Sequence, residues 1–200
     1  SGVDLNLYCY TPEPENRKVR VLFTARMIVE KGVFVLVDAA LKLKEQYKDK
    51  VEFLLCGGLD DNPKAIKEEE LKTVCDGEYI QWLGYRTDVL ELLKSCHIVA
   101  FPSYYKEGLP KSLIEATAVG RPIVTTNSIG CKETVIDGYN GYLIPIKDSD
   151  TLAERLKILF EDEGLRQNMG RNSRMLAEKD FSIENVIQKH LEIYNQLSKA

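Results

Sequence analysis

The chain has 200 residues, a length that predicts a single full domain. Its 27 Lys and Arg residues nearly balance 31 Asp and Glu residues, and the formal net charge of −4 offers no basic surface for nucleic acid or an anionic membrane. The 44% hydrophobic content supplies a buried core and excludes a disordered chain. No apolar run reaches the roughly 18 to 20 residues that span a bilayer, and no signal pattern opens the sequence, so we expect a soluble protein.

The cysteine and histidine content bears on metals and redox environment. The five cysteines are odd in number, widely spaced and without a C-x-x-C pair: Cys9, Cys56, Cys75, Cys96 and Cys131. This pattern is not typical of a disulfide framework or a zinc site, and only His97 and His190 could add imidazole ligands. We therefore expect reduced thiols, a cytoplasmic location, and no metal or cofactor.

Apolar runs of strand length alternate with helical patterns through most of the chain. We expect strands at residues 19–25, 51–56, 79–83, 98–101, 122–126 and 141–144. We expect helices between them at residues 32–47, 63–74, 88–94, 109–119 and 131–136. Strands that are apolar on both faces and separated by helices predict an α/β, Rossmann-like parallel sheet of about six strands with helices on both faces.

After Pro145 the pattern is helical only. Asp148 or Asp150 can cap a helix that reaches about residue 162, a second helix is expected at residues 164–178, and Ser182 can cap a third that runs to the end. This last helix carries a broad apolar surface. The surface either packs against the domain's own sheet or docks onto a partner domain.

The first candidate site follows the first strand, where Arg26 and Lys31 enclose four residues and precede Gly32. Two cations on a turn that enters a helix can converge on one anion, and a phosphate group is the expected ligand. The alternative is a solvated Arg26 and a Lys31 that pairs with Glu30.

The second candidate site follows the fourth strand. Pro110 suits the first turn of a helix and Gly108 permits close approach of the loop, so the amides near Leu109 are expected to point into a crevice. A helical path would separate Glu107 and Glu115 by about 12 Å. That span fits a ligand with phosphate in the middle, Glu107 holding a sugar ring and Glu115 a ribose. The alternative makes Glu115 a solvated helix residue and Glu107 part of an acidic helix start.

Three other loops lie at the same predicted edge of the sheet. Gly57-Gly58 and Tyr85-Arg86 are candidate walls for a nucleotide base, and Gly130 could present further amides. The two base-wall candidates are more often only loops, and for Gly130 the alternative is a plain turn.

In this order the motifs resemble those of family 4 glycosyltransferases of the GT-B fold: R-x4-K-G, E-x7-E within PSYYKEGLPKSLIEA, GRPIVTT, GCKETVIDGYNGYLIP and a helical tail. The resemblance covers nearly the whole chain. It implies retaining transfer of a hexose from a nucleotide sugar bound in the C-terminal Rossmann-like half. It also implies that Arg26 and Lys31 neutralise the diphosphate, Glu107 engages the donor sugar and Glu115 binds the ribose.

The resemblance implies a domain arrangement as well. Residues 1–18 resemble the hinge between two halves, residues 19–180 the donor-nucleotide domain, and residues 181–200 a helix that would pack toward an N-terminal acceptor domain absent here. We therefore expect the chain alone to be inactive. The segment PSYYKEG has one residue more between Ser and Glu than the commoner P-S-x-x-E-G. This longer form resembles that of the subgroup that builds bacterial surface polysaccharides and lipid-linked oligosaccharides, often from UDP-sugars. The full-length protein would then be cytoplasmic and peripheral to the inner membrane face, where a lipid-linked acceptor is found.

Breaking the sugar–phosphate bond leaves negative charge on the diphosphate. We expect Arg26, Lys31 and the amides near Leu109 to stabilise that charge. For a retaining family with no obvious protein nucleophile, the resemblance implies front-face attack with a donor phosphate oxygen accepting the proton.

Two other functions stay open. One is a noncatalytic nucleotide or nucleotide-sugar-binding module. The other is a sugar-nucleotide epimerase, whose site needs acidic and basic groups for which this histidine-poor sequence shows no pattern.

Three conspicuous features are interpreted as structural or left open. The D-S-D at residues 148–150 precedes a helical pattern, so we interpret it as a helix cap and not as a metal motif. His97 is expected at a helix exit or strand edge and not as an acid or base. Tyr104 and Tyr105 either line the acceptor mouth or act as packing anchors.

Overall fold

A computed structural model describes residues 2–15, 17–106, 108–188 and 191. Its six strands form a parallel sheet in the order β3-β2-β1-β4-β5-β6. The strands are β1 Val19–Thr24, β2 Val51–Cys56, β3 Ile80–Gly84, β4 Ile98–Phe101, β5 Ile123–Thr126 and β6 Gly141–Ile144. This order is that of a doubly wound sheet and confirms the predicted Rossmann-like fold.

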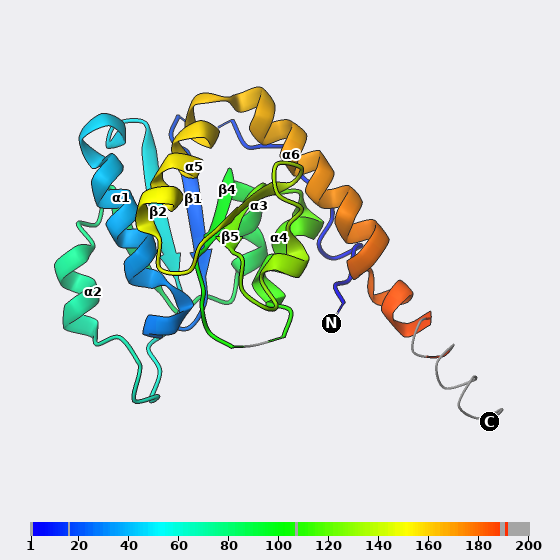
Figure 1. The fold of residues 1–200 in the computed structure, drawn as a ribbon, viewed down its shortest axis with the longest axis horizontal. Coiled ribbons are helices and arrows are strands. Elements are labelled where there is room, and N and C mark those ends of the chain that lie inside the picture. The colour runs from blue at the N-terminus through cyan, green and yellow to red at the C-terminus, as the bar shows by residue number, and fades with distance from the viewer. Residues whose placement is uncertain (1, 16, 107, 189–190, 192–200) are drawn as a thin grey trace.

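Helices cover both faces of the sheet. They are α1 Val33–Tyr47, α2 Glu68–Val74, α3 Val89–Ser95, α4 Lys111–Val119, α5 Ser149–Glu161 and α6 Glu163–Leu176. α1 and α5 pack against each other over one face, whereas α3 and α4 cover the other, with α6 beside α4 (Figure 1). A π-helical turn, Ala177–Phe181, follows α6. No helix among the described residues is long and apolar enough to cross a membrane.

The centre of the sheet explains why its strands are apolar on both faces. Every residue of β4 is buried, and the rings of Phe23 on β1 and Phe101 on β4 stack with their centroids 5.7 Å apart. Full burial of such a side chain stabilises the fold by roughly 1.5 to 3 kcal/mol. The two central strands are therefore firmly fixed, and the loops that follow them start from a rigid base.

The predicted helices at residues 63–74 and 131–136 are the most shortened in the structure. α2 begins at Glu68 and not near residue 63, because the preceding backbone pairs with the loop after β1: the Ile66 amide donates to the Met27 carbonyl (2.8 Å) and the Val29 amide to the Lys64 carbonyl (3.0 Å). The helix expected at residues 131–136 is a single 3-10 turn, Lys132–Thr134.

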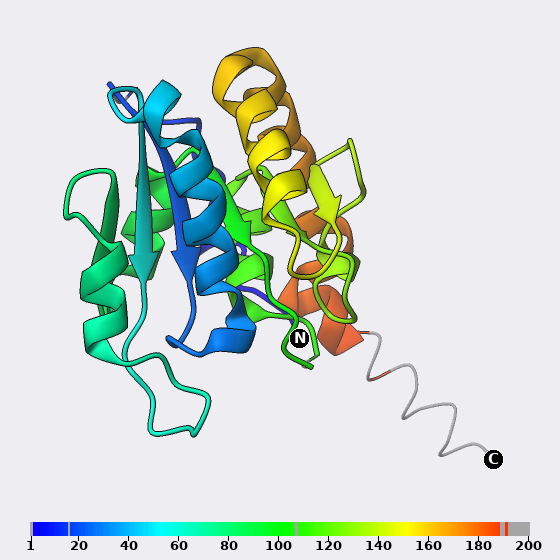
Figure 2. The same cartoon turned by 60° about the vertical axis from the view of Figure 1, so that its left-hand side comes forward.

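The N-terminal segment lies along the domain and does not extend away from it. Arg174 on α6 donates to the carbonyl of Tyr8 (2.8 Å), and Arg121 donates to the carbonyl of Thr11 (3.0 Å). The amide of Ile183, near the other end of the chain, donates to the carbonyl of Val3 (3.0 Å). In Figure 2 the N-terminus accordingly lies close to the last helical turns. The described part of the predicted terminal helix thus contacts this segment, and its remainder falls outside the described residues.

Candidate functional site

The chain order reverses between β1 and β4, and the loops that follow these two strands lie against each other. The amide of Tyr104 donates to the carbonyl of Glu30 (2.9 Å). Gly32 sits where the loops touch, with a φ of 88°, and a Cβ there would lie 2.2 Å from the carbonyl oxygen of Pro102. Glycine is required for this approach. Ligands of doubly wound sheets bind at such a reversal, so the two main predicted motifs share the favoured position.

A pocket of about 240 Å³ opens at this carboxyl edge. It brings together six of the predicted site residues: Arg26, Gly57, Gly58, Tyr85, Arg86 and Glu115. The other lining residues are Thr24, Ala25, Cys56, Val89 and Ser112. Loops after three strands and one face of α4 therefore build a single pocket, which we call the edge pocket.

Both arginines of the edge pocket are paired with carboxylates. Arg26 is 58% exposed at its side chain, and its Nη1 donates to Oδ2 of Asp60 (2.7 Å). The backbone amide of Asn62 and the Arg26 guanidinium together lower the pKa of Asp60. Arg86 binds Asp88 through two bonds, from Nε (2.8 Å) and Nη2 (2.6 Å). An anion entering the pocket would compete with these carboxylates for the guanidinium groups.

Lys31 is packed against two aromatic rings. It is only 7% exposed, and its Nζ lies 4.5 Å from the ring centroid of Tyr105 and 5.8 Å from that of Phe101. The neighbouring Glu30 carboxylate accepts a hydrogen bond from Lys64 (2.6 Å). Lys31 is not among the residues that line the edge pocket. It contacts instead the loop between β4 and α4.

That loop lines a second, larger pocket of about 640 Å³, which we call the loop pocket. Its lining residues are Tyr104, Tyr105, Lys106, Gly108, Ser128, Ile129 and Ile146. Both tyrosines also carry a lysine over the ring, Lys31 on Tyr105 and Lys147 on Tyr104. Each tyrosine thus lines this cavity and packs against a lysine, as expected of a packing anchor. A place at the acceptor mouth stays a prediction.

The start of α4 differs from its predicted position. Pro110 has an extended ψ of 123° and is the N-cap, so the helix begins at Lys111, two residues later than expected. Neither Leu109 nor Pro110 is among the described residues that line the two pockets. Glu107, predicted to contact the donor sugar, lies outside the described residues.

Glu115 is buried, with 7% exposure, although it is charged and lies on a helix. Its Oε1 accepts a hydrogen bond from the hydroxyl of Tyr8 (2.7 Å) and lies 3.5 Å from Nζ of Lys111. The alternative of a solvated helix residue is therefore wrong. A buried carboxylate that lines a pocket is costly unless its oxygens find partners, so the position is suited to a ligand with hydroxyl groups.

Two neighbours of Glu115 were not predicted from the sequence. Ser112 lies one helical turn before Glu115 and faces the same pocket, so its spacing of three residues could have indicated it. Tyr8 is 107 positions away in the chain and follows no local pattern. No sequence signal pointed to it.

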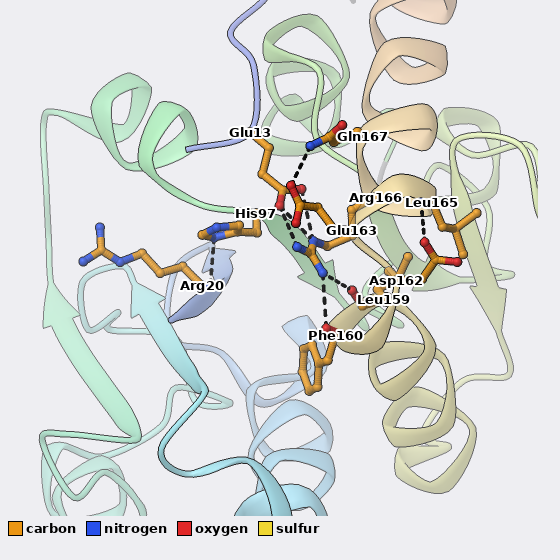
Figure 3. A network of polar contacts seen from close by, with 10 residues as sticks. All are labelled: Glu13, Arg20, His97, Leu159, Phe160, Asp162, Glu163, Leu165, Arg166 and Gln167. Atoms are coloured by element: carbon orange, nitrogen blue, oxygen red, sulfur yellow. Dashed lines mark hydrogen bonds and ion pairs between the residues drawn. The ribbon is translucent and has the colours of Figure 1, made fainter. Parts of the chain in front are cut away.

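Another cavity, of about 680 Å³, lies at the opposite edge of the sheet, where the strands begin. Figure 3 shows its polar network, in which Arg166 donates to Glu13 and to the carbonyls of Leu159 and Phe160. Nδ1 of His97 accepts a bond from the amide of Arg20 (3.0 Å), and burial lowers the pKa of His97 to about 4. His97 is thus a neutral residue at a strand edge, as expected. Since Glu13 and Arg166 are bonded to each other, we assign this network a structural role.

Other candidate features have local roles. The Asp148 carboxylate accepts from the Thr151 amide (2.9 Å) and caps α5, which confirms the interpretation of the D-S-D segment. The Gly130 amide donates to Glu133 within its own turn (2.6 Å), as in a plain turn. All five cysteines are free. Among the described residues, no group of three or more His, Cys, Asp or Glu side chains is arranged to hold a metal ion.

Comparison with known proteins gives a consistent result. The family described as Glycosyl transferases group 1 matches residues 11–175. The N,N'-diacetylbacillosaminyl-diphospho-undecaprenol alpha-1,3-N-acetylgalactosaminyltransferase of Campylobacter jejuni is 38% identical over 185 residues, which are 92% of this chain and 46% of that protein.

Two solved structures share the fold. Anabaena Alr3699/HepE in complex with UDP superposes with a TM-score of 0.83 and 25% identity, over 100% of this chain and 56% of that one. The C-terminal domain of a group 1 glycosyl transferase family protein (LpcC) from Francisella tularensis gives a TM-score of 0.76 at 23% identity, over 91% of this chain and 100% of that one. The chain thus spans about half the length of the first two of these relatives.

Proposed function

The chain belongs to the group 1 glycosyltransferase family, and on that premise we propose that it is the donor-binding half of a retaining glycosyltransferase. The proposed donor is a UDP-sugar, and the proposed acceptor is a glycan or a lipid-linked saccharide. UDP is favoured by the Anabaena complex, and a lipid-linked acceptor by the name of the Campylobacter relative. The observation that carries the proposal is the edge pocket, where Arg26 and Glu115 line one cavity at the reversal of the sheet.

The proposal assigns the two pockets to two parts of the donor. The edge pocket takes the nucleoside, with Glu115 accepting from the ribose hydroxyls and Tyr85 and Arg86 beside the base. The loop pocket takes the hexose, with Glu107 as its proposed partner. Lys31, which lies against Tyr105 of that loop, and Arg26 on the other side then flank the diphosphate.

In the proposed reaction, the bond from the sugar anomeric carbon to the diphosphate breaks and a bond to the acceptor oxygen forms on the same face. The acceptor proton passes to a donor phosphate oxygen. The guanidinium of Arg26, the ammonium of Lys31 and the amides at the start of α4 stabilise the charge that develops on the leaving diphosphate. Losing one such contact typically lowers the rate by about 10² to 10³.

We also propose roles for the two ends of the chain and for the full-length protein. Residues 1–18 serve as the hinge to an N-terminal acceptor domain, and the terminal helix packs toward that domain. The full-length enzyme works in the cytoplasm at the membrane surface that carries the acceptor. The 200-residue chain alone then binds the donor without transferring the sugar.

Calorimetric titration with UDP, GDP and ADP tests the donor site. We expect UDP to bind most tightly and Arg26→Ala to weaken it by about 10- to 100-fold, since a hydrogen bond to a charged group contributes about 1.5 to 3 kcal/mol. Arg171→Ala removes an exposed arginine at the opposite edge and is the matched control. Unchanged UDP binding in Arg26→Ala would remove the phosphate site from the proposal. Transfer by the chain joined to an acceptor domain separates an enzyme from a noncatalytic binding module.

A further inference from the structure

The hydrogen bond between Tyr8 and Glu115 assigns a role to a residue outside both pockets. We propose that Tyr8 is a positioning residue for nucleotide binding: its hydroxyl fixes the Glu115 carboxylate in the orientation that accepts the ribose hydroxyls. This inference rests on the proposed donor site and adds to it a residue from the segment before β1.

The geometry divides the two oxygens of the carboxylate between protein and pocket. Tyr8 donates to Oε1 (2.7 Å), and Lys111 approaches that same oxygen (3.5 Å). Within the described residues Oε2 has no hydrogen-bond partner, although Glu115 lines the edge pocket. One oxygen is therefore held by the protein while the other stays available for a ligand.

Tyr8 is itself held by the helix that carries Glu115. Nη1 of Arg174 donates both to the Tyr8 carbonyl (2.8 Å) and to the Ala118 carbonyl on α4 (2.8 Å). Farther along the segment, the Thr11 amide donates to the Val119 carbonyl (3.1 Å). The phenol and the carboxylate are thus attached to one rigid element, and this pre-organisation reduces the ordering cost of binding.

The electrostatics favour a donating Tyr8. Burial, followed by the hydrogen bond to Glu115, raises the pKa of Tyr8, so the phenol stays protonated at neutral pH. A bond from a hydroxyl to a charged carboxylate is stronger than one between neutral groups. Lys111 fixes the Glu115 carboxylate less strongly than Tyr8 does, because the lysine side chain is 82% exposed. Without the phenol, the carboxylate can turn toward Lys111 and away from the ribose.

The test compares UDP with 2′,3′-dideoxyuridine 5′-diphosphate, which lacks both ribose hydroxyls, on the 200-residue chain by calorimetry. We expect Tyr8→Phe to weaken UDP by about three- to tenfold and to leave the dideoxy nucleotide unchanged, since the variant loses one oriented hydrogen bond. The effect on UDP should vanish when Glu115→Gln is already present, because both changes disturb the same contact. Tyr10→Phe, in the same segment but outside the edge pocket, should bind both nucleotides as the parent does.

Several outcomes decide between the possibilities. Equal weakening of both nucleotides by Tyr8→Phe would overturn the positioning role, because it would mean a general structural loss. Unchanged binding of both would overturn it as well. A parent chain that binds no UDP would refute the proposed donor site itself, which is a distinct result. Thermal unfolding of each variant shows that the folded protein is being compared.

Discussion

Asp60 holds Arg26 at the rim of the edge pocket, with 2.7 Å between Oδ2 and Nη1. The same carboxylate also accepts from the Asn62 amide through Oδ1 (2.8 Å), so the acid and its loop are fixed before any ligand arrives. A diphosphate that binds Arg26 competes with Asp60 for the positive charge of the guanidinium. The acid therefore acts as an internal competitor in the proposed site.

Asp60→Asn should tighten UDP binding. The amide oxygen can keep the bond to Asn62 while the negative charge near Arg26 is lost, and we expect an increase in affinity of about two- to fivefold, the range of one exposed ion pair. Calorimetry at low and high salt measures it, and the gain should shrink at high salt. Asp38→Asn removes an exposed acid that is paired with Lys42 and does not line the pocket, and this variant should change nothing. Weaker UDP binding in Asp60→Asn would contradict the competition.

Gly57 is expected to tolerate no side chain. A Cβ at this position would lie 1.7 Å from the carbonyl oxygen of Ala25, so the loops after β1 and β2 would have to separate. We expect Gly57→Ala to lower the free energy of unfolding by about 2 to 3 kcal/mol and to weaken UDP binding together with it.

Gly77→Ala is the matched control for Gly57→Ala. Gly77 has a φ of 80° but open space around its Cβ position, so only backbone strain remains and the loss should be about 1 kcal/mol. Urea unfolding of both variants measures the two effects. Equal losses would show that the contact with Ala25 is not the cause.

The sequence predicted the strands and the edge at which the site lies. Continuous apolar runs such as residues 19–25 match buried strands because both faces of the sheet are covered. The rule that ligands bind at the carboxyl edge also predicts that Arg26, Gly57 and Glu115 lie near one another, and all three line the edge pocket.

Long-range pairings could not be predicted in this way. The late start of α2 depends on backbone bonds between the segment at residues 64–66 and the loop after β1. The hydrogen bond from Tyr8 to Glu115 joins parts of the chain 107 positions apart. Periodicity reports which face of an element is buried, but it carries no information on which distant residue completes a site.

Glu13→Gln should destabilise the fold strongly. Glu13 accepts from Nη2 (2.6 Å) and Nε (3.0 Å) of Arg166, and the two side chains are 9% and 6% exposed. Removing one charge leaves the other buried without compensation, which typically costs about 3 to 5 kcal/mol. Urea unfolding gives the value, with Glu68→Gln as the control, because its pair with Lys72 is exposed and should contribute little. A loss below about 1 kcal/mol would show that the pair is effectively solvated.

The neutral His97 predicts how stability depends on pH. Burial and, after it, the charges of Arg166 and Arg121 lower the pKa of His97 to about 4, whereas an unfolded histidine titrates near 6.5. Between these values the unfolded chain binds a proton that the folded chain does not. The free energy of unfolding should therefore be independent of His97 above pH 6.5 and fall as the pH drops toward 4, by about 3 kcal/mol in total. His97→Asn keeps a hydrogen-bond acceptor near the Arg20 amide but has no titrating group, so its decline over this window should be shallower than that of the parent. Parallel profiles for the two proteins would place the acid sensitivity in other groups.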